Sequence, residues 1–225
     1  MYPGTRSSNP IVIEGRTQAT TSLLGKVLLI SSLGFFVTGL GVAMAPAFYS
    51  TGLLLICFIA SIALIFGVRA ARKTPVLALG LFLLLALVMG IEIAPWILSL
   101  LHSGPAGINI VFNAAVTTAV GMGCIGLGAQ VASFDYRKVG NYALGALLVL
   151  IIVGVLGMFF HFVNPTFYSW ASLAIFSVLL LVDFMRIRNG GDGATATELA
   201  VSIYLDGLNI FLALTELFSG GSRRR

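Results

Sequence analysis

The sequence contains very little charge for its length. Only 9% of its 225 residues are Asp, Glu, Lys or Arg, whereas 58% are hydrophobic. A soluble domain carries about 25% charged residues, and a water-facing surface cannot be built from so few. Most of the surface must therefore face lipid. The length suffices for about six to eight spans of ~20 residues with short loops, which leaves no room for a soluble domain.

Residues typical of metal sites and disulfides are also scarce. The two cysteines, Cys57 and Cys124, lie inside apolar runs, which favours small packed side chains over a disulfide framework. No spacing of His, Cys and carboxylates is typical of zinc, and no nucleophile–base pair stands out. We therefore expect no cofactor and no enzymatic activity. The net charge of +5 comes from residues between apolar runs, so it reports membrane topology and not nucleic-acid binding.

Apolar runs long enough to cross a bilayer as helices dominate the chain, and no strand-like alternation competes with them. We predict spans at 23–45, 52–70, 75–95, 107–132, 140–162, 167–186 and 197–218. The sequence thus predicts an all-α integral membrane protein with seven transmembrane helices in a domain over 23–218. A polar, mobile cytoplasmic tail over 1–22 would precede it, and a basic tail over 219–225 would follow.

The basic residues predict the orientation. With the N-terminus in the cytoplasm, ten of the 13 fall on or near the inner side, as the positive-inside rule favours: Arg6, Arg16, Lys26, Arg69, Arg72, Lys73, Arg137, Lys138, Arg186 and Arg188. The exceptions are the arginines at 223–225. Either the last segment does not fully cross the membrane, or seven spans are correct and this tail is tolerated outside. The short loops are the stronger signal, so we keep seven spans, in a prokaryotic cytoplasmic membrane.

Residues 121–126 read Gly-Met-Gly-Cys-Ile-Gly and match the glycine pattern of dinucleotide-binding folds. That pattern requires a preceding strand and a following helix, whereas these glycines lie inside one apolar span. They indicate close helix packing instead.

Ionisable residues inside the spans are the strongest functional signal, because placing one at a helix centre costs about 2.5–3.5 kcal/mol on insertion scales. The candidates are Arg69, Glu92, Asp183, Glu198, Asp206 and Glu216. Asp206 lies deepest, ten residues into the last span and so ~15 Å along that helix.

Asp206 also belongs to a polar stripe in which residues recur at spacings of three and four, on one helical face. The stripe consists of Glu198, Ser202, Asp206, Asn209, Ala213 and Glu216. A polar stripe cannot face lipid, so the last helix should be central and line a polar path.

Asp183 has two interpretations. It is either an ordinary interfacial carboxylate paired with Arg186 one turn later, or the partner of Asp206; Arg69, one turn before Arg72, is similarly ambiguous. Two adjacent carboxylates cannot both ionise cheaply and titrate as a unit, whereas a nearby arginine favours their charged forms. If the last helix starts flush with the membrane face, Asp206 lies deeper in the membrane than Asp183. The two carboxyls can then meet only if helix six or seven extends past the membrane face, or if Asp183 lies deeper than its neighbour Arg186 suggests.

Several segments carry a resemblance to a known family. They are Leu181-Val182-Asp183-Phe184-Met185, the run from Ser202 to Leu212 (Ser-Ile-Tyr-Leu-Asp-Gly-Leu-Asn-Ile-Phe-Leu), Phe66-Gly67-Val68-Arg69, and Ser133-Phe134-Asp135 with Gly140. Together they resemble the Bax inhibitor-1/YccA (TMBIM) family, and the likeness runs from the first span to residue 218.

The resemblance implies a seven-helix fold whose C-terminal helix is central and wrapped by the other six. It implies that Asp183 and Asp206 act as a pH sensor beside a pore, that Arg69 is their switching partner, and that the activity is calcium leak. YccA-like members often lack the aspartate pair, and one regulates a membrane protease. This chain retains both aspartates, which favours the calcium-leak branch. Gly207, where bulkier residues are usual, and the arginine-rich tail depart from the pattern.

Two functions follow, with an enzyme as a weak third. The first is a pH-sensitive calcium leak channel gated by Asp183, Asp206 and Arg69, with transient calcium ligands at Asp206 and Glu216 and further oxygens at Glu198, Ser202 and Asn209. The second is a non-conducting regulator that binds a membrane protease or a cell-death partner. An intramembrane aspartyl protease would need Gly-x-Gly-Asp, and 189–192 read Asn-Gly-Gly-Asp in a loop. The expected partners are the lipid bilayer, calcium as the permeant ion and other membrane proteins, with the chain a monomer or weak oligomer.

Overall fold

The computed structural model describes residues 10–45, 50–160 and 163–222, and these residues form helices without strands. The arginines at 223–225 therefore lie outside the described residues. Seven α-helices are long and apolar enough to cross a membrane, which confirms the predicted all-α integral membrane fold. Their bounds are α1 Pro10–Met44, α2 Thr51–Ala70, α3 Pro75–Leu101, α4 Pro105–Val131, α5 Tyr136–Phe160, α6 Pro165–Arg188 and α7 Ala196–Ser222.

Two helix ends differ most from the sequence prediction. The first span was predicted at 23–45 after a mobile tail over 1–22. The apolar part of α1 begins at Ser22, but the helix itself begins at Pro10, because a helix can continue beyond the membrane face; residues 1–9 of the predicted tail lie outside the described residues. The third span was predicted to end at Pro95, yet α3 continues through this proline to Leu101. Proline is tolerated inside transmembrane helices because neighbouring groups satisfy the backbone carbonyl that it frees.

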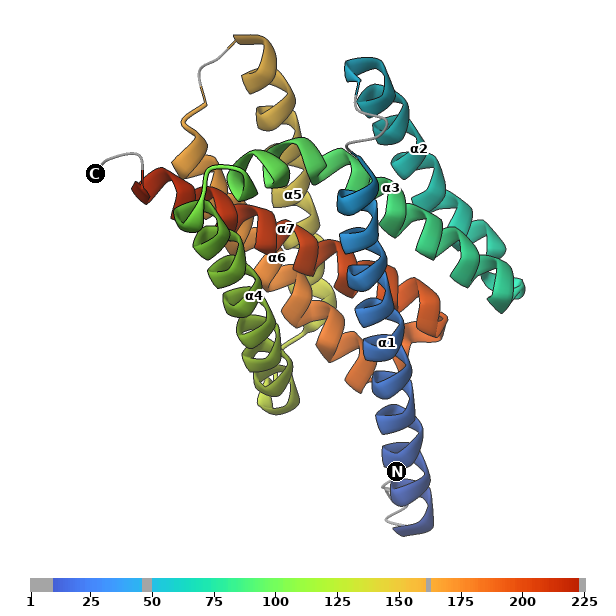
Figure 1. The fold of residues 1–225 in the computed structure, drawn as a ribbon. Coiled ribbons are helices and arrows are strands. Elements are labelled where there is room, and N and C mark those ends of the chain that lie inside the picture. The colour runs from blue at the N-terminus through green and yellow to red at the C-terminus, as the bar shows by residue number, and fades with distance from the viewer. Residues whose placement is uncertain (1–9, 46–49, 161–162, 223–225) are drawn as a thin grey trace.

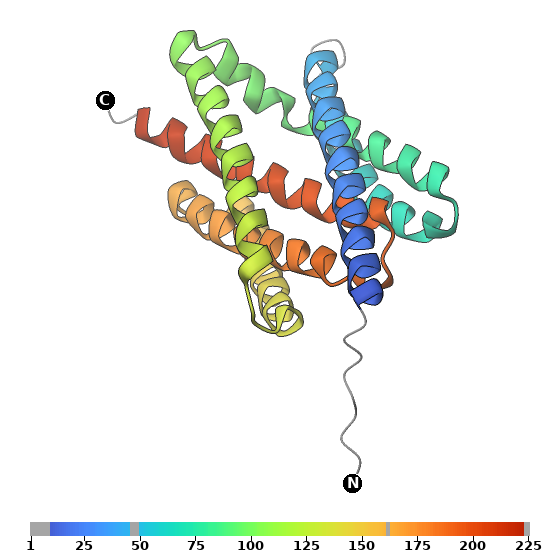
Figure 2. The same ribbon diagram turned by 90° about the horizontal axis from the view of Figure 1, so that it is seen from below.

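The C-terminal helix α7 is central. A larger share of its membrane-length segment is buried than of any other span. It packs chiefly against α6, α4 and α1 and has smaller contacts with α3 and α2, while α5 packs on α6. Figures 1 and 2 both show α6 and α7 side by side, with α1 and α4 crossing α7.

Tyr204 anchors α7 in the core. Its ring is fully buried against Phe82 of α3 in an edge-to-face contact and against Phe35 of α1. The Tyr204 hydroxyl hydrogen-bonds with Thr38 Oγ1 at 2.7 Å. The Thr38 hydroxyl in turn donates to the Ala86 carbonyl of α3 at 3.1 Å. A buried polar group needs such partners, so this network fixes how α7 lies against α1 and α3.

Two glycines permit a close contact between the backbones of α1 and α3. A Cβ at Gly41 or Gly90 would collide with backbone atoms of the opposite helix, so these backbones touch. The glycines at 121–126 of α4 were predicted to pack closely against other helices. Only Gly126 does so: a Cβ added there would contact the Phe184 ring of α6, whereas Gly121 and Gly123 have open space beside them.

Candidate functional site

A cavity of about 1100 Å³ lies between α2 and α5, with α6 and α7 as its back wall. Along α6 its lining extends from Tyr168 to Arg186, a rise of ~27 Å that approaches the ~30 Å thickness of a hydrocarbon core. The polar and charged side chains that line it are Ser61, Arg69, Tyr136, Arg137, Asn141, Tyr168, Ser169, Ser172, Asp183, Arg186, Asp192, Ser202, Asp206 and Asn209. This cavity therefore presents polar and charged side chains over a length close to that of a membrane span.

Asp206 projects from α7 into the wall of this cavity, and Asp183 of α6 lies beside it. Asp206 is only 6% exposed, and its carboxyl interacts electrostatically with that of Asp183. The Oδ2 atom of Asp206 is buried and has no hydrogen-bond partner among the described residues. The structure therefore brings the two predicted aspartates together, and one carboxyl oxygen remains available for a proton or a cation.

Asp183 has its own partners on both helices. The Ser202 hydroxyl of α7 hydrogen-bonds with its carboxyl, and Arg186, one turn along α6, is the cation that acts on it. Asp183 thus interacts electrostatically with Arg186 and with the Asp206 carboxyl, while no ion pair within 4 Å joins it to Arg186 among the described residues.

Arg69 of α2 lines the same cavity but is exposed. No ion pair or hydrogen bond joins it to Asp183 or Asp206 within the part of the chain that the structure describes. Arg69 is therefore placed on the cavity wall with the pair while remaining disengaged from it.

The polar stripe of α7 divides between two roles. Ser202 and Asn209 line the cavity with Asp206. Glu198 instead forms a capping box: its Oε2 accepts from the Thr195 backbone N–H at 2.7 Å, and Thr195 Oγ1 accepts from the Glu198 N–H at 3.2 Å. Glu216 is not among the cavity-lining residues. The oxygen ligands that α7 itself offers to the cavity therefore come from Ser202, Asp206 and Asn209.

A second charged cluster lies around Asp192, in the loop between α6 and α7, at the end of the cavity that the orientation predicted from the basic residues would place on the inner side. The Asp192 carboxylate accepts a 2.7 Å hydrogen bond from Arg137 Nη2, and its two oxygens share the single hydrogen of the Tyr136 hydroxyl at 2.9–3.0 Å; both donors are on α5. Arg186 Nε lies 3.8 Å from Asp192 Oδ2. The hydrogen bond from Arg137 is the main reason that the pKa of the Asp192 carboxyl lies below its usual range.

Sequence reasoning missed this cluster. A signal exists, because Asp192 stands between glycines in Gly190-Gly191-Asp192-Gly193, in a loop flanked by basic residues. The backbone of Asp192 adopts φ 51°, a left-handed conformation that Asp tolerates better than most residues. Arg186 thus lies between two carboxylates, Asp183 in the cavity wall and Asp192 at its inner end.

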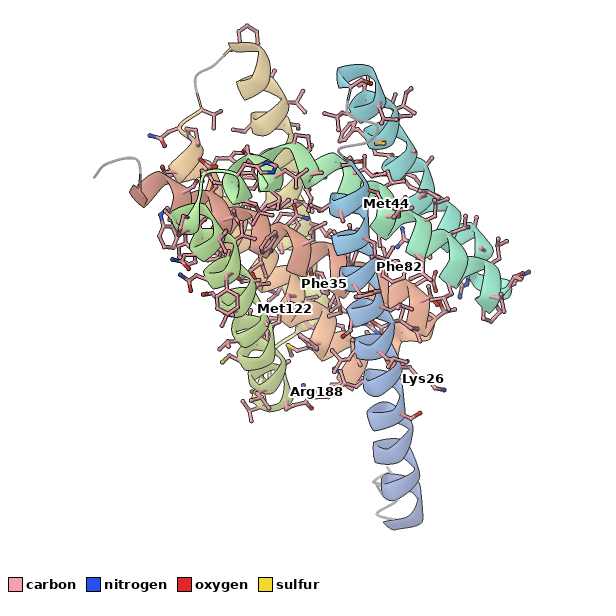
Figure 3. The ribbon with its side chains drawn as sticks, in the orientation of Figure 1. Lys26, Phe35, Met44, Phe82, Met122 and Arg188 are labelled. Carbon is pink, nitrogen blue, oxygen red and sulfur yellow. The ribbon has the colours of Figure 1, made fainter. Side chains whose placement is uncertain are left out.

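Gly207, which follows Asp206, faces away from the cavity toward α1 and α4. A Cβ at this position would come 2.8 Å from Met122 of α4 and from Phe35 of α1. Figure 3 shows Phe35 and Met122 between these two helices. The small residue beside Asp206 is therefore explained by packing on the opposite face of α7.

No group of three or more His, Cys, Asp and Glu side chains capable of holding a metal ion is found among the described residues.

Comparison with known proteins identifies one family. Residues 20–224 match the family described as inhibitor of apoptosis-promoting Bax1. The uncharacterised protein Cj0236c of Campylobacter jejuni is 26% identical over 227 residues, covering 99% of this chain and 94% of that protein. An uncharacterised protein of Helicobacter pylori is 27% identical over 165 residues, covering 71% of this chain and 69% of its own length.

Proposed function

Since the chain belongs to the Bax inhibitor-1 family, we propose that this integral multi-pass membrane protein is a pH-sensitive calcium leak channel. Its path would be the cavity between α2 and α5, and its gate the pair Asp183–Asp206 with Arg69 as switching partner. The chemistry proposed is ion passage without catalysis or a resident cofactor.

The observation that carries this proposal is the state of the Asp206 carboxyl. It is buried within a membrane span, it faces the Asp183 carboxyl, and its Oδ2 lacks a hydrogen-bond partner among the described residues. A carboxyl buried inside a membrane span costs free energy, and such groups usually mark a path for ions or protons. Carboxylate oxygens are also the ligands that calcium prefers.

The surroundings of the pair suggest how pH acts on it. The other charged and titratable groups that line the cavity with the pair are Arg69 on α2, Tyr136 and Arg137 on α5, Tyr168 and Arg186 on α6, and Asp192 in the following loop. Arg137 is held by Asp192, and Arg186 lies between Asp192 and Asp183. Arg69 is the cation left to respond to the charge of the pair, because an ionised pair attracts it across the cavity and a protonated pair does not.

The path is tested by filling the cavity. We expect calcium to enter proteoliposomes that contain the native protein faster than it enters empty liposomes. Ser172→Phe, which adds a ring to the α6 wall, should reduce this flux, because Ser172 is buried and lines the cavity. Ser32→Phe is the matched control, since Ser32 of α1 is exposed and lines a different groove.

Equal calcium entry with native protein and with empty liposomes would refute the channel, and the non-conducting regulator would then be the function to pursue. Equal loss of flux in both phenylalanine variants would refute the path through this cavity.

A further inference from the structure

The outer face of α4 is the least covered surface of the spans. A smaller share of its membrane-length segment is buried than of any other span. Helix α4 packs on α7, α6 and α3, and Figure 2 shows it lying across α6 and α7. Its buried residues, such as Ala114 and Thr118, belong to this packed face. The other face of α4 is therefore directed away from the bundle, into lipid unless another protein covers it.

That outer face carries small and polar residues where lipid contact would favour apolar ones. They recur at spacings of three and four, which places them along one side of the helix. We call this set the α4 stripe, and it consists of Asn109, Asn113, Thr117, Gly121, Cys124 and Gly128. Its asparagines, threonine and cysteine are exposed. A polar stripe on an exposed side of a membrane helix is the pattern of an interface between helices.

The two asparagines of the stripe have no partner in the described chain. No side-chain hydrogen bond of Asn109 or Asn113 occurs within residues 10–45, 50–160 and 163–222, whereas Asn141 and Asn209 line the polar cavity between α2 and α5. Asn113 lies eight residues after Pro105, ~12 Å along a helix of ~40 Å, and so inside a hydrocarbon core of ~30 Å. An amide at this depth costs free energy unless another group bonds to it.

The glycines of the stripe leave room for a partner helix. A Cβ added at Gly121 or at Gly128 would meet nothing within 4 Å in the described part of the chain. The glycine segment of α4 was predicted to allow close helix packing, and at Gly121 no helix of the same chain uses the space. Small residues let two membrane helices approach closely, and asparagine and threonine side chains then hydrogen-bond across the contact. The α4 stripe offers both features.

We propose that the α4 stripe is the surface through which two copies of this chain associate, α4 against α4. Two copies inserted in the same orientation are related by a two-fold axis along the membrane normal, so each stripe residue near the axis faces its own counterpart. The stripe carries no charge, and an asparagine amide both donates and accepts, so the surface is complementary to itself. The inference is independent of the leak function, because no α4 residue lines the cavity between α2 and α5.

Cys124 provides a direct test, because it lies on the stripe and is exposed, whereas Cys57 of α2 is buried. In Cys57→Ala protein reconstituted at a low protein-to-lipid ratio, mild oxidation should join Cys124 of two copies. The product should have twice the chain mass of 23.7 kDa. Cys57→Ala with Cys124→Ser and Ile59→Cys is the reference, since Ile59 is an exposed residue of α2. Equal yields for the two cysteine positions would overturn the proposal, because a disulfide needs Cα atoms held within about 7 Å.

Two glycine variants test the close approach. Gly121→Leu should remove the Cys124 product, because its side chain holds the two helices apart. Gly123→Leu is the matched control, since Gly123 lies ~160° around α4 from Gly121 and is also exposed. A Cβ at either glycine meets nothing within 4 Å among the described residues, so both variants should keep the native unfolding midpoint. Equal yields of the product in the two variants would contradict the proposed interface.

Asn113 tests the hydrogen bonds across the interface. Energy transfer between copies labelled at the N-terminus, measured over a range of protein-to-lipid ratios, gives the dissociation constant of the dimer. This constant should rise by about tenfold in Asn113→Leu, as expected for the loss of two interhelical hydrogen bonds, and stay near the native value in Asn113→Gln, which keeps the amide. An unchanged constant in Asn113→Leu would show that lipid covers the stripe. A Cys124 product of another mass in cell membranes would show that a different membrane protein covers it.

Discussion

The Asp206 carboxyl of α7 and the Asp183 carboxyl of α6 interact within one cavity wall, and Oδ2 of Asp206 is buried without a hydrogen-bond partner among the described residues. The two carboxyls are held differently. Asp183 has Ser202 and Arg186 beside it, whereas the main influence on Asp206 besides burial is the Asp183 charge. Under the proposed gating, a change in the protonation of this pair would alter the contact between α6 and α7, the two helices with the largest buried share.

The two arginines Arg69 and Arg188 should behave oppositely when each is replaced by glutamine. Arg188 donates to three carbonyls at the end of α4, those of Ala129, Gln130 and Ala132, at 2.6–2.9 Å. Arg188→Gln should lower the free energy of unfolding by about 1.5–3 kcal/mol, the usual contribution of hydrogen bonds to a charged group.

Arg69→Gln should leave that free energy within about 0.5 kcal/mol of the native value, because Arg69 has no such partner here. It should nevertheless change the dependence of calcium flux on pH. Thermal unfolding in detergent and flux assays on both variants check these expectations. A large loss of stability in Arg69→Gln would mean that Arg69 is engaged with the aspartate pair in most molecules.

The Asp192 cluster should stabilise the inner end of α5 at neutral pH. Since the pKa of Asp192 is lowered in the folded protein, its contribution is complete above the ordinary Asp value of about 3.9 and is lost as pH falls through the lower folded value. Asp192→Asn should therefore speed amide exchange at Tyr136 and Arg137 near neutral pH. The difference from native protein should vanish in strong acid.

Asp135→Asn provides the comparison for this measurement. Asp135 is exposed and accepts from the Arg137 and Lys138 backbone N–H groups, a role that asparagine fills equally well. Faster exchange in this variant, or equal exchange in native protein and Asp192→Asn, would show that Asp192 does not hold α5. Because Asp192 stays ionised from about pH 5 to 8, it cannot produce a pH dependence of flux in that range.

The backbone contact between α1 and α3 gives a prediction on stability. Gly90→Leu forces a side chain into the backbone of α1 near Thr38 and Gly41, and should destabilise the protein by about 1–3 kcal/mol or more, as overpacking does. Gly80→Leu on the same helix meets nothing within 4 Å and should have little effect. Equal unfolding midpoints for the two variants would contradict the packing described for α1 and α3.

The sequence predicted the fold well because its main signal, the length of apolar runs, is local. Each of the seven spans was found, and errors fell at ends such as Pro95, where neighbouring helices determine whether a helix continues. The spacing of polar residues in the last span likewise predicted its central position, since a polar stripe needs burial.

The site was less accessible to sequence reasoning because its contacts join distant segments. Periodicity placed Glu198 on the stripe of Asp206, but the residue three positions earlier, Thr195, makes it a capping group. Nothing local indicates that Asp192 pairs with Arg137, 55 residues away, or that Ser61 reaches Glu92 on the next helix. Such pairings depend on how helices cross, which the pattern within one helix does not specify.

The most direct test of the central claim is calcium influx into proteoliposomes measured from about pH 5 to 8, the range in which a membrane pH sensor has to act. Native protein is compared with Asp183→Asn and with Asp206→Asn. The account predicts that native flux varies with pH and that either substitution flattens this dependence, because a single carboxyl no longer titrates as a pair. A native pH dependence that both substitutions leave intact would contradict it.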